Sequence, residues 1–320
     1  MTDYYIAIDL GGTNIRAARC TADGQILARA SHLTQAAEGQ AAVINRIIAA
    51  VHEVWPSDAN AGARAIGISA PGPVDPWRGI VVNAPNLSGW YNVPLRSILA
   101  ETFHTPTRLG NDANLAALAE YRFGAGRGFD NMIYLTLSTG IGGGVISDSR
   151  LLLGAKGLAA ELGHISVDLN GPRCNCGNIG CVEVMAAGPA IARNAVTRIT
   201  AGERSAISDL VGGDLLRVSA ETVGQAAAAG DPLARSLVRE AGRAIGQAIV
   251  NMLHAFNPGI IVCGGGLTKM GDLLLQPIRE TMAERVMSRD YIVDIVLAPL
   301  GDDVALLGAL ALAMEPVREK

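Results

Sequence analysis

The densest group of metal-binding side chains in the sequence is one histidine followed by three cysteines. His164 is followed ten positions later by Cys174, and Cys176 and Cys181 complete the group. Three thiolates and one imidazole form a closed tetrahedral site for structural zinc, with no position left for water. A disulfide is disfavoured, because the chain has 5 cysteines and nothing in its first residues suggests export. The spacing predicts one structural Zn²⁺ bound by these four residues.

Two carboxylates flank this predicted zinc loop. Glu161 precedes His164, and Glu183 follows Cys181. Together with the second ring nitrogen of His164, they would offer hydrogen-bond donors and acceptors suited to a polyhydroxylated ligand. A solvated loop with ordinary surface charge is equally compatible with the sequence.

Three glycine-rich segments each follow an apolar run, at 10–14 (LGGTN), 139–144 (TGIGGG) and 264–266 (GGG). Glycine lets the backbone approach a ligand and present successive N–H groups, which suits phosphate. No lysine follows a glycine, so a P-loop is excluded. Each segment alone is typical of a tight hairpin, but three in one chain favour a nucleotide. Asp9, before the first segment, could hold Mg²⁺ through water or cap the turn.

Asp112 stands where a strand ends and a helix begins, in the segment Gly110-Asn111-Asp112-Ala113-Asn114. One interpretation is a helix N-cap, whose carboxylate accepts first-turn N–H groups. The other is a general base that takes the proton from an attacking hydroxyl. Both interpretations are compatible, because such corners face the ligand-binding edge of open α/β sheets.

The apolar runs predict the elements that must position these residues. Strands are predicted at 4–9, 15–20 and 26–28, and a similar order of strand, glycine segment and strands recurs at 132–138, 145–146 and 151–153. Helical spacing follows 44–55 and 237–256, and further helices are predicted after Asp112 and at 304–314. The pattern indicates an α/β protein with two related halves. We predict a small domain over 1–111, completed by the C-terminal helix (303–320), and a large domain over 112–302 that carries the zinc loop.

Composition excludes several classes of protein. The chain has 320 residues, a net charge of −4 and a pI of about 5.8, so no basic footprint for nucleic acid or a membrane surface exists. The first residues, MTDYYIAID, do not resemble a signal peptide, and no apolar stretch reaches the ~20 residues needed to span a bilayer. We therefore expect a cytoplasmic protein with neither a nucleic-acid nor a membrane partner.

The sequence resembles the ROK family (repressor, open reading frame, kinase), and within it the bacterial ATP-dependent glucokinases. The resemblance covers nearly the whole chain. It is carried by DLGGTN (9–14), SAPGPVD (69–75), NAPNLSGW (83–90), GNDAN (110–114), LSTGIGGG (137–144), ELGH (161–164), CNCGNIGCVE (174–183) and IVCGGG (261–266). It implies a two-domain actin-like ATPase (ribonuclease H-like) fold with an interdomain cleft. It also implies a hexokinase-type phosphotransferase that uses Mg-ATP to phosphorylate the 6-hydroxyl of glucose.

The resemblance assigns roles residue by residue. Asp112 would be the catalytic base. The sugar hydroxyls would be bound by Gly72, Asn86, Asn111, Asp112, Glu161, His164 and Glu183. The phosphates would be held by Asp9, with Mg²⁺, and by Gly11, Gly12, Thr13, Asn14, Thr139 and Gly140. Gly265 and Gly266 would lie against the adenosine, and His164 would bind zinc and sugar through different nitrogens.

Several alternatives remain open at this level. The sugar could be N-acetylglucosamine, N-acetylmannosamine, fructose, mannose or allose, although NAPNLSGW looks more like the glucokinases. The donor could be polyphosphate, as in some relatives. A sugar-responsive regulator is disfavoured, because the first glycine motif leaves no room for a preceding DNA-binding segment. An actin-like ATPase scaffold would not need the zinc loop. Relatives are commonly dimers or tetramers, so we expect a homo-oligomer.

Overall fold

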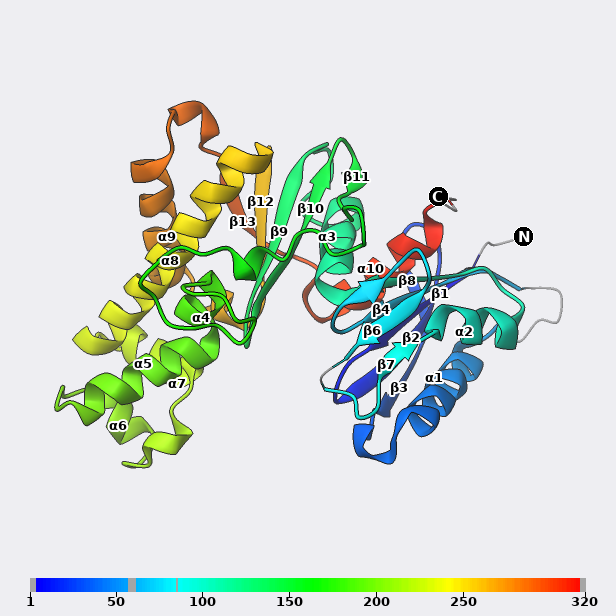
Figure 1. The fold of residues 1–320 in the computed structure, drawn as a ribbon, viewed down its shortest axis with the longest axis horizontal. Coiled ribbons are helices and arrows are strands. Elements are labelled where there is room, and N and C mark those ends of the chain that lie inside the picture. Colours follow the sequence, from blue (N-terminus) through cyan, green and yellow to red (C-terminus); the bar gives the residue numbers. More distant parts are fainter. Residues whose placement is uncertain (1–3, 57–61, 85, 317–320) are drawn as a thin grey trace. The chain divides into compact units, whose positions relative to one another are not determined.

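The computed structural model describes residues 4–56, 62–84 and 86–316, and it has the α/β architecture that the sequence predicts (Figure 1). Elements up to residue 123 are β1 (Tyr4–Leu10), β2 (Asn14–Cys20), β3 (Ile26–Leu33), α1 (Gln40–Val54), β4 (Ala63–Ala70), β5 (Val74–Asp75), β6 (Ile80–Asn83), β7 (Tyr91–Val93), α2 (Leu95–Phe103), β8 (Thr107–Asn111) and α3 (Asp112–Phe123). The remaining strands and α-helices are β9 (Met132–Leu137), β10 (Ile141–Ser147), β11 (Arg150–Leu151), α4 (Val182–Ala186), α5 (Gly188–Thr200), α6 (Ala206–Leu210), α7 (Ala220–Ala228), α8 (Pro232–Phe256), β12 (Ile260–Gly264), α9 (Asp272–Arg285), β13 (Asp294–Leu297) and α10 (Val304–Met314).

The first sheet has the strand order β3-β2-β1-β4-β8. The three strands predicted at 4–9, 15–20 and 26–28 are present as β1, β2 and β3, which pair antiparallel in a meander. Strand β4 pairs parallel with β1, and β8 pairs parallel with β4. The register pairs Asp9 with Ser69 and Ala70 with Asn111. The carboxyl ends of three parallel strands therefore bring Asp9, the segment after β4 and Asp112 to one edge of this sheet, where ligands bind in open α/β sheets.

The two faces of the first sheet are covered by helices of different character. On β1, Ile6 and Ile8 point into a core of large aliphatic side chains shared with α1, whereas Ala7 points to the opposite face against α10. On that face the side chains are small, and a Cβ added to Gly67 of β4 would clash with the backbone oxygen of Ala309. Because α10 is apolar all round, close contact on this face buries its central residues, Leu306 to Ala311, and Ala313.

The second sheet has the order β11-β10-β9-β12-β13. Strand β12, formed by the apolar run before the third glycine segment, lies parallel to β9 and β13. The predicted glycine turn at 139–144 is shorter than expected, since β10 already begins at Ile141. Gly143 is required for packing rather than for turning, because a Cβ there would lie 2.5 Å from the carbonyl oxygen of Tyr134. The turn itself is confined to Ser138–Gly140.

The long helix α8 is central to the helical layer that accompanies the second sheet. Its buried residues include the predicted apolar stripe from Leu237 to Leu253, and it ends at Asn257, which adopts the left-handed conformation typical of a C-cap. Helices α4, α5, α7 and α9 contact it. Among the described helices, none is both long and apolar enough to cross a bilayer.

The chain divides into two compact units. The first unit comprises Met1–Asp130, Gly144–Ala160 and Ala298–Lys320, and the second comprises Asn131–Gly143 and Glu161–Leu297. This division differs from the predicted boundary at 111/112, because α3 packs against α10 and β4, so it groups with the first unit. The C-terminal helix α10 also belongs to the first unit, and positions 317–320 of the predicted segment lie outside the described residues.

We expect the substitution Gly67→Ala to lower the free energy of unfolding by about 2–3 kcal/mol, because the new methyl group must displace the backbone of α10. Chemical denaturation followed by circular dichroism measures this. The control is Gly62→Ala, since a Cβ at Gly62 meets no atom within 4 Å. Equal stability of the two variants would contradict the close packing of α10 on β4.

Candidate functional site

The predicted zinc ligands come together in the second unit. The ligand atoms of His164, Cys174, Cys176 and Cys181 all lie within 4.8 Å of one another. Nδ1 of His164 is 3.7 Å from Sγ of Cys174, and the sulfur atoms of Cys176 and Cys181 are 3.6 Å apart. Tetrahedral zinc–sulfur bonds of ~2.3 Å place ligands ~3.8 Å apart, so the four residues fit one zinc ion. His164 faces the cluster with Nδ1, which leaves Nε2 for a different partner.

Burial makes the thiolate form of Cys181 depend on a nearby cation. Cys174 and Cys181 are buried, whereas Cys176 is exposed. Burial, with smaller contributions from the neighbouring thiols, raises the pKa of Cys181 to about 12. A thiol in that environment becomes a thiolate near neutral pH only beside positive charge, which a bound metal ion would supply.

The backbone shapes the cysteine loop around this cluster. The N–H of Cys174 donates to the carbonyl of Asn178 at 2.8 Å, and the N–H of Val167 donates to the carbonyl of Gly180 at 2.8 Å. Gly180 has φ +66°, and a Cβ there would clash with the carbonyl oxygen of Asp168. Only glycine fits such a position, so the loop needs it to bring Cys181 back toward His164.

Glu183 connects the cysteine loop to the second glycine segment. Cys181 is the N-cap of α4, and Glu183 lies in the first turn of that helix. Its Oε2 accepts a hydrogen bond of 3.0 Å from the N–H of Ile141. An added Cβ on Gly140 would approach the same oxygen at 2.8 Å. The conformation of the 138–141 turn is therefore linked to the position of α4, a connection that sequence reasoning did not foresee.

Glu161, by contrast, is exposed. It is the residue before the short 3₁₀ helix Leu162–His164, and the N–H of His164 donates to its carbonyl at 3.1 Å. The two predicted hydroxyl-binding acids thus differ: Glu183 already holds a backbone amide, whereas the Glu161 carboxylate faces solvent.

A cavity of about 730 Å³ lies in the second unit beside this turn. Thr139 and Gly266, from two of the predicted glycine segments, both line it. So do the N-termini of α5, at Gly188, and α7, at Ser219 and Ala220. Two helix N-termini and backbone N–H groups favour an anion, and the volume suits a nucleotide. Gly265 does not line the cavity but has φ +90°, and a Cβ there would clash with the backbone of Leu137.

Neither helix N-terminus was predicted to take part. Gly188 is followed by proline at a first-turn position of α5, a sequence signal for a helix start that could have indicated it. The N–H of Gly188 donates to the carbonyl of Ser138 at 2.8 Å, which anchors α5 to the glycine turn.

In the first unit, Asp9 is paired with an arginine rather than capping the turn. Nε and Nη2 of Arg16 donate to its Oδ2 at 2.9 and 2.7 Å, and Nη1 of Arg16 donates to the carbonyl of Asp302 at 2.8 Å. Burial raises the pKa of Asp9, and the guanidinium offsets part of this increase. Both hydrogen bonds from Arg16 use Oδ2, so Oδ1 is the carboxylate atom better suited to a water on Mg²⁺.

The first glycine turn is held by its own backbone and by Thr34. The N–H of Gly11 donates to the carbonyl of Asn14 at 2.9 Å, and the buried hydroxyl of Thr34 donates to the carbonyl of Gly11 at 2.7 Å. The N–H of Thr34 donates to the carbonyl of Thr13 at 2.7 Å. A Cβ on Gly12 would lie 3.2 Å from Cβ of Asn86, so this exposed asparagine stands beside the turn.

Trp90 belongs to the core rather than to a ligand site. Its side chain is fully buried in the first-unit core. It therefore supports the segment that carries Asn86 through packing.

Asn111, not Asp112, caps α3. Its Oδ1 accepts from the N–H of Ala113 at 3.0 Å and of Asn114 at 3.3 Å, while its Nδ2 donates to the carbonyl of Gly72 at 3.0 Å. Asp112 is consequently the first helical residue, with an exposed carboxylate whose Oδ1 accepts from the N–H of Ala113 at 2.8 Å. The N-cap interpretation of Asp112 is thus wrong, because the neighbouring amide takes that role.

Gly72 adopts φ +78°, and a Cβ there would clash with the carbonyl oxygen of Asn83. The Asn111 bond and this close approach together fix the segment after β4 against the start of α3. Predicted site residues Gly72, Asn111 and Asp112 are therefore neighbours in space.

The sequence matches the ROK family over residues 5–316. It is 39% identical to a glucokinase of Thermotoga maritima over 98% of both chains. Its fold is similar to that of a ROK family glucokinase from Streptomyces griseus, solved in complex with glucose and AMPPNP, with a TM-score of 0.79, 35% identity and coverage of 97% of this chain and 99% of that one. It is also similar to a ROK family transcriptional regulator, a homologue of the E. coli MLC protein, with a TM-score of 0.84, 29% identity and coverage of 98% of this chain and 78% of that one.

The chain belongs to the ROK family. Its fold is the two-domain, actin-like ATPase fold of the family's sugar kinases, as the sequence predicts.

We expect the purified protein to contain about one zinc ion per chain. Cys176→Ser should lose that metal and lower Tm by about 5 °C or more, because the free energy of metal binding contributes to folding. Elemental analysis and thermal unfolding measure both quantities. The control Cys263→Ala removes a buried thiol outside the cluster and should retain the zinc. Wild-type protein without zinc would contradict this interpretation of the cluster.

Proposed function

We propose that this protein is a glucokinase, which transfers the γ-phosphoryl group of ATP to the 6-hydroxyl of glucose. The observation that carries the proposal is the Glu183–Ile141 hydrogen bond. It links a cysteine–histidine cluster and its acids to a glycine turn beside a nucleotide-sized cavity. Near full-length similarity to glucokinases, one of them solved with glucose and an ATP analogue, supports the same activity.

In this proposal, Asp112 is the general base. Its carboxylate is exposed and held at the first position of α3 by the Asn111 cap. It takes the proton from the attacking hydroxyl as the new O–P bond forms. Glu161, Glu183 and Nε2 of His164 bind the other sugar hydroxyls, together with Asn86, while Asn111 acts mainly by fixing the base and Gly72.

Phosphoryl transfer needs charge neutralisation and alignment more than covalent help. Without a P-loop lysine, backbone N–H groups of the turns at 11–14 and 139–140 and the N-termini of α5 and α7 bind the phosphates. Mg²⁺, when bound near Asp9, supplies additional positive charge. Zinc has no step in the reaction; the cysteines and His164 fix the loop that carries Glu161 and Glu183.

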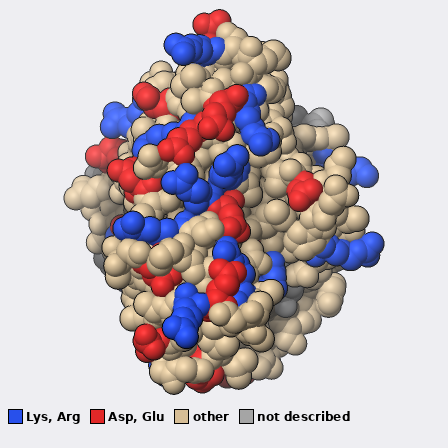
Figure 2. All heavy atoms as spheres, turned by 90° about the vertical axis from the view of Figure 1, so that its left-hand side faces the viewer, with Lys and Arg blue, Asp and Glu red and all other residues tan. Residues whose placement is uncertain are grey.

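A second candidate function is sugar-responsive regulation, which the similarity to the ROK transcriptional regulator favours. Nucleic-acid binding needs a basic surface. Figure 2 shows acidic and basic side chains interspersed on one face of the molecule. That face therefore offers no uniformly basic patch. In the second unit, Arg198 pairs with both Glu203 and Glu240. Gel-shift assays with and without glucose would detect DNA binding, and we expect none.

Sugar and donor specificity are addressed by one assay. ADP release should be fastest with glucose among a panel containing mannose, fructose, allose, N-acetylglucosamine and N-acetylmannosamine. Replacement of ATP by polyphosphate should abolish glucose 6-phosphate formation. ATP hydrolysis that no hexose stimulates would contradict the kinase proposal. We also propose a homodimer or homotetramer, which light scattering after gel filtration measures.

Asp112→Asn should fold and bind glucose but lose about 10³-fold in kcat, because the amide cannot accept the hydroxyl proton. A coupled ADP assay and isothermal calorimetry with glucose measure the two effects. Asp272→Asn is the matched control, since Asp272 is likewise the exposed first residue of a helix. Its kcat should be unchanged. Near-normal turnover of Asp112→Asn would remove Asp112 from the role.

Glu183→Ala should raise KM for both glucose and ATP, because it removes a hydroxyl partner and also frees the N–H of Ile141 in the phosphate turn. Glu161→Ala should raise KM for glucose only, since its carboxylate holds no part of that turn. Steady-state kinetics with each substrate varied separates the two. Identical KM patterns in both variants would show that the Glu183–Ile141 bond has no effect on ATP.

A further inference from the structure

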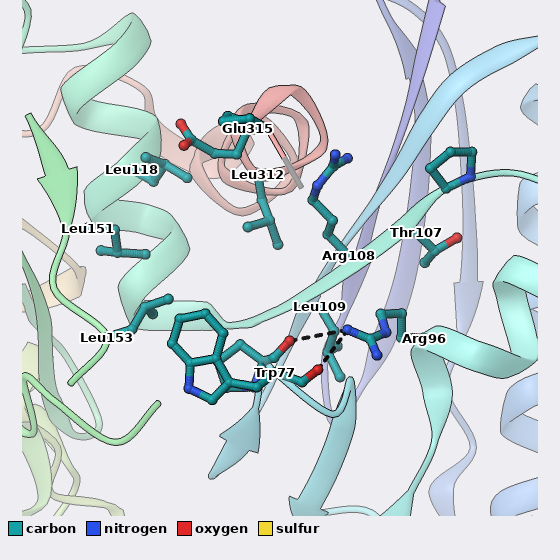
Figure 3. Close-up of a pocket in the computed structure, with 13 residues that line it drawn as sticks. Trp77, Arg96, Thr107, Arg108, Leu109, Leu118, Leu151, Leu153, Leu312 and Glu315 are labelled. Carbon is teal, nitrogen blue, oxygen red and sulfur yellow. Dashed lines mark hydrogen bonds between the residues drawn. The ribbon is translucent and has the colours of Figure 1, made fainter. Parts of the chain in front are cut away.

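The first unit contains a second cavity, of about 410 Å³, which none of the proposed glucose or ATP residues lines. Figure 3 shows it between β8, α3, α10, the segment after β5 and the segment around β11. Its volume falls in the range of small-molecule sites.

Most of the cavity wall is apolar. Leu118 of α3, Leu312 of α10, and Leu151 and Leu153 from β11 and the residues after it surround the space, and the indole of Trp77 closes one side (Figure 3). A flat aromatic face among branched aliphatic side chains favours a ligand with an aromatic body.

One guanidinium group supplies positive charge to this apolar cavity. Arg108 extends from β8, and its Nη1 donates to the carbonyl of Ala313 at 2.7 Å. Among the described residues, no other acceptor is hydrogen-bonded to this guanidinium. Burial lowers the pKa of Arg108, although Glu315 partly offsets this effect. The charged form is thus incompletely solvated, and an anion in the cavity would stabilise it.

The other two charged groups in the lining are engaged elsewhere. Arg96 uses Nη1 to hold the carbonyls of Trp77, at 3.0 Å, and of Pro76, at 3.4 Å (Figure 3). Glu315 lies 3.7 Å from Nη1 of Arg122. With two arginines and one glutamate in its lining, the cavity has a net charge of +1, which matches one negative charge better than two.

We propose that this cavity is a regulatory binding site for a small monocarboxylate with an aromatic body. The carboxylate pairs with Arg108, and the ring packs between Trp77 and the leucines. Such a ligand is chemically unlike a hexose or a nucleotide.

The cavity is built partly from the strand and the helix that also position the proposed base, without contacting Asp112 itself. Arg108 precedes Asn111 by three residues on β8, and Leu118 lies on the helix that Asp112 begins. Occupancy is therefore expected to change kcat. This second step rests on the proposed kinase function, whereas binding does not.

Calorimetry with 4-phenylbutyrate as the probe tests the binding step. We expect saturable binding by the wild-type protein, and binding weaker by about tenfold or more for 4-phenylbutanamide, which keeps the ring and lacks the charge. In Arg108→Met the two compounds should bind alike. Arg150→Met is the matched control, because Arg150 is exposed and lies beside the cavity residues in sequence without lining it. It should behave as wild type.

Leu153→Trp provides a second test that leaves Arg108 in place. The larger side chain fills the cavity and should abolish binding of 4-phenylbutyrate while circular dichroism remains native. No binding by folded wild-type protein at about 10 mM probe, or equal binding of the acid and the amide, would overturn the proposal. If 4-phenylbutyrate binds without any change in kcat, only the regulatory step is overturned. If the protein binds 4-phenylbutyrate but phosphorylates no hexose, the proposed kinase function is wrong and the binding site stands.

Discussion

In the candidate site of the second unit, the cysteine loop and the glycine turn are joined by one hydrogen bond, which the backbone N–H of Ile141 donates to the carboxylate of Glu183. It connects a loop shaped by four metal-binding side chains to the turn that opens β10. A carboxylate bonded to a backbone amide fixes both partners, because either one left alone would lose a charge-assisted bond. The metal cluster and the glycine turn are therefore parts of a single structure, although their residues are separated by the whole ELGH and cysteine segment.

A comparable constraint operates in the first unit. The side-chain amide of Asn111 is satisfied on both sides, by the first turn of α3 and by the carbonyl of Gly72. The carboxylate of Asp112 is thereby left at the first helical position, exposed at the edge where β1, β4 and β8 end. Strand β8 and helix α3 also contribute Arg108 and Leu118 to the Arg108 cavity. The same two elements therefore position the proposed base and form part of the proposed ligand site.

The small residues of the first sheet explain why this region is well defined. Ala7, Gly67 and Ala309 allow α10 to lie directly on the sheet, and α3 packs against α10. Close-packed backbones of this kind tolerate little displacement, since almost any added atom meets main chain. The helix that carries Asp112 is consequently supported by close backbone packing, where Gly308 of α10 lies against the backbone of Leu115, as well as by the leucines of α10.

Local sequence determined the α/β class, the meander of β1 to β3, the long helix α8 and the four members of the cysteine–histidine cluster. These features follow from short-range periodicity or from ligand chemistry with little freedom of spacing. The tertiary structure decided which residue caps α3, where the chain divides into units, that Asp9 pairs with Arg16, and that Glu183 holds Ile141. Each of these features depends on which hydrogen-bonding group or packing surface the folded chain brings next to a given residue. Most of these partners are far apart in the chain, so local sequence patterns do not predict which of them come into contact.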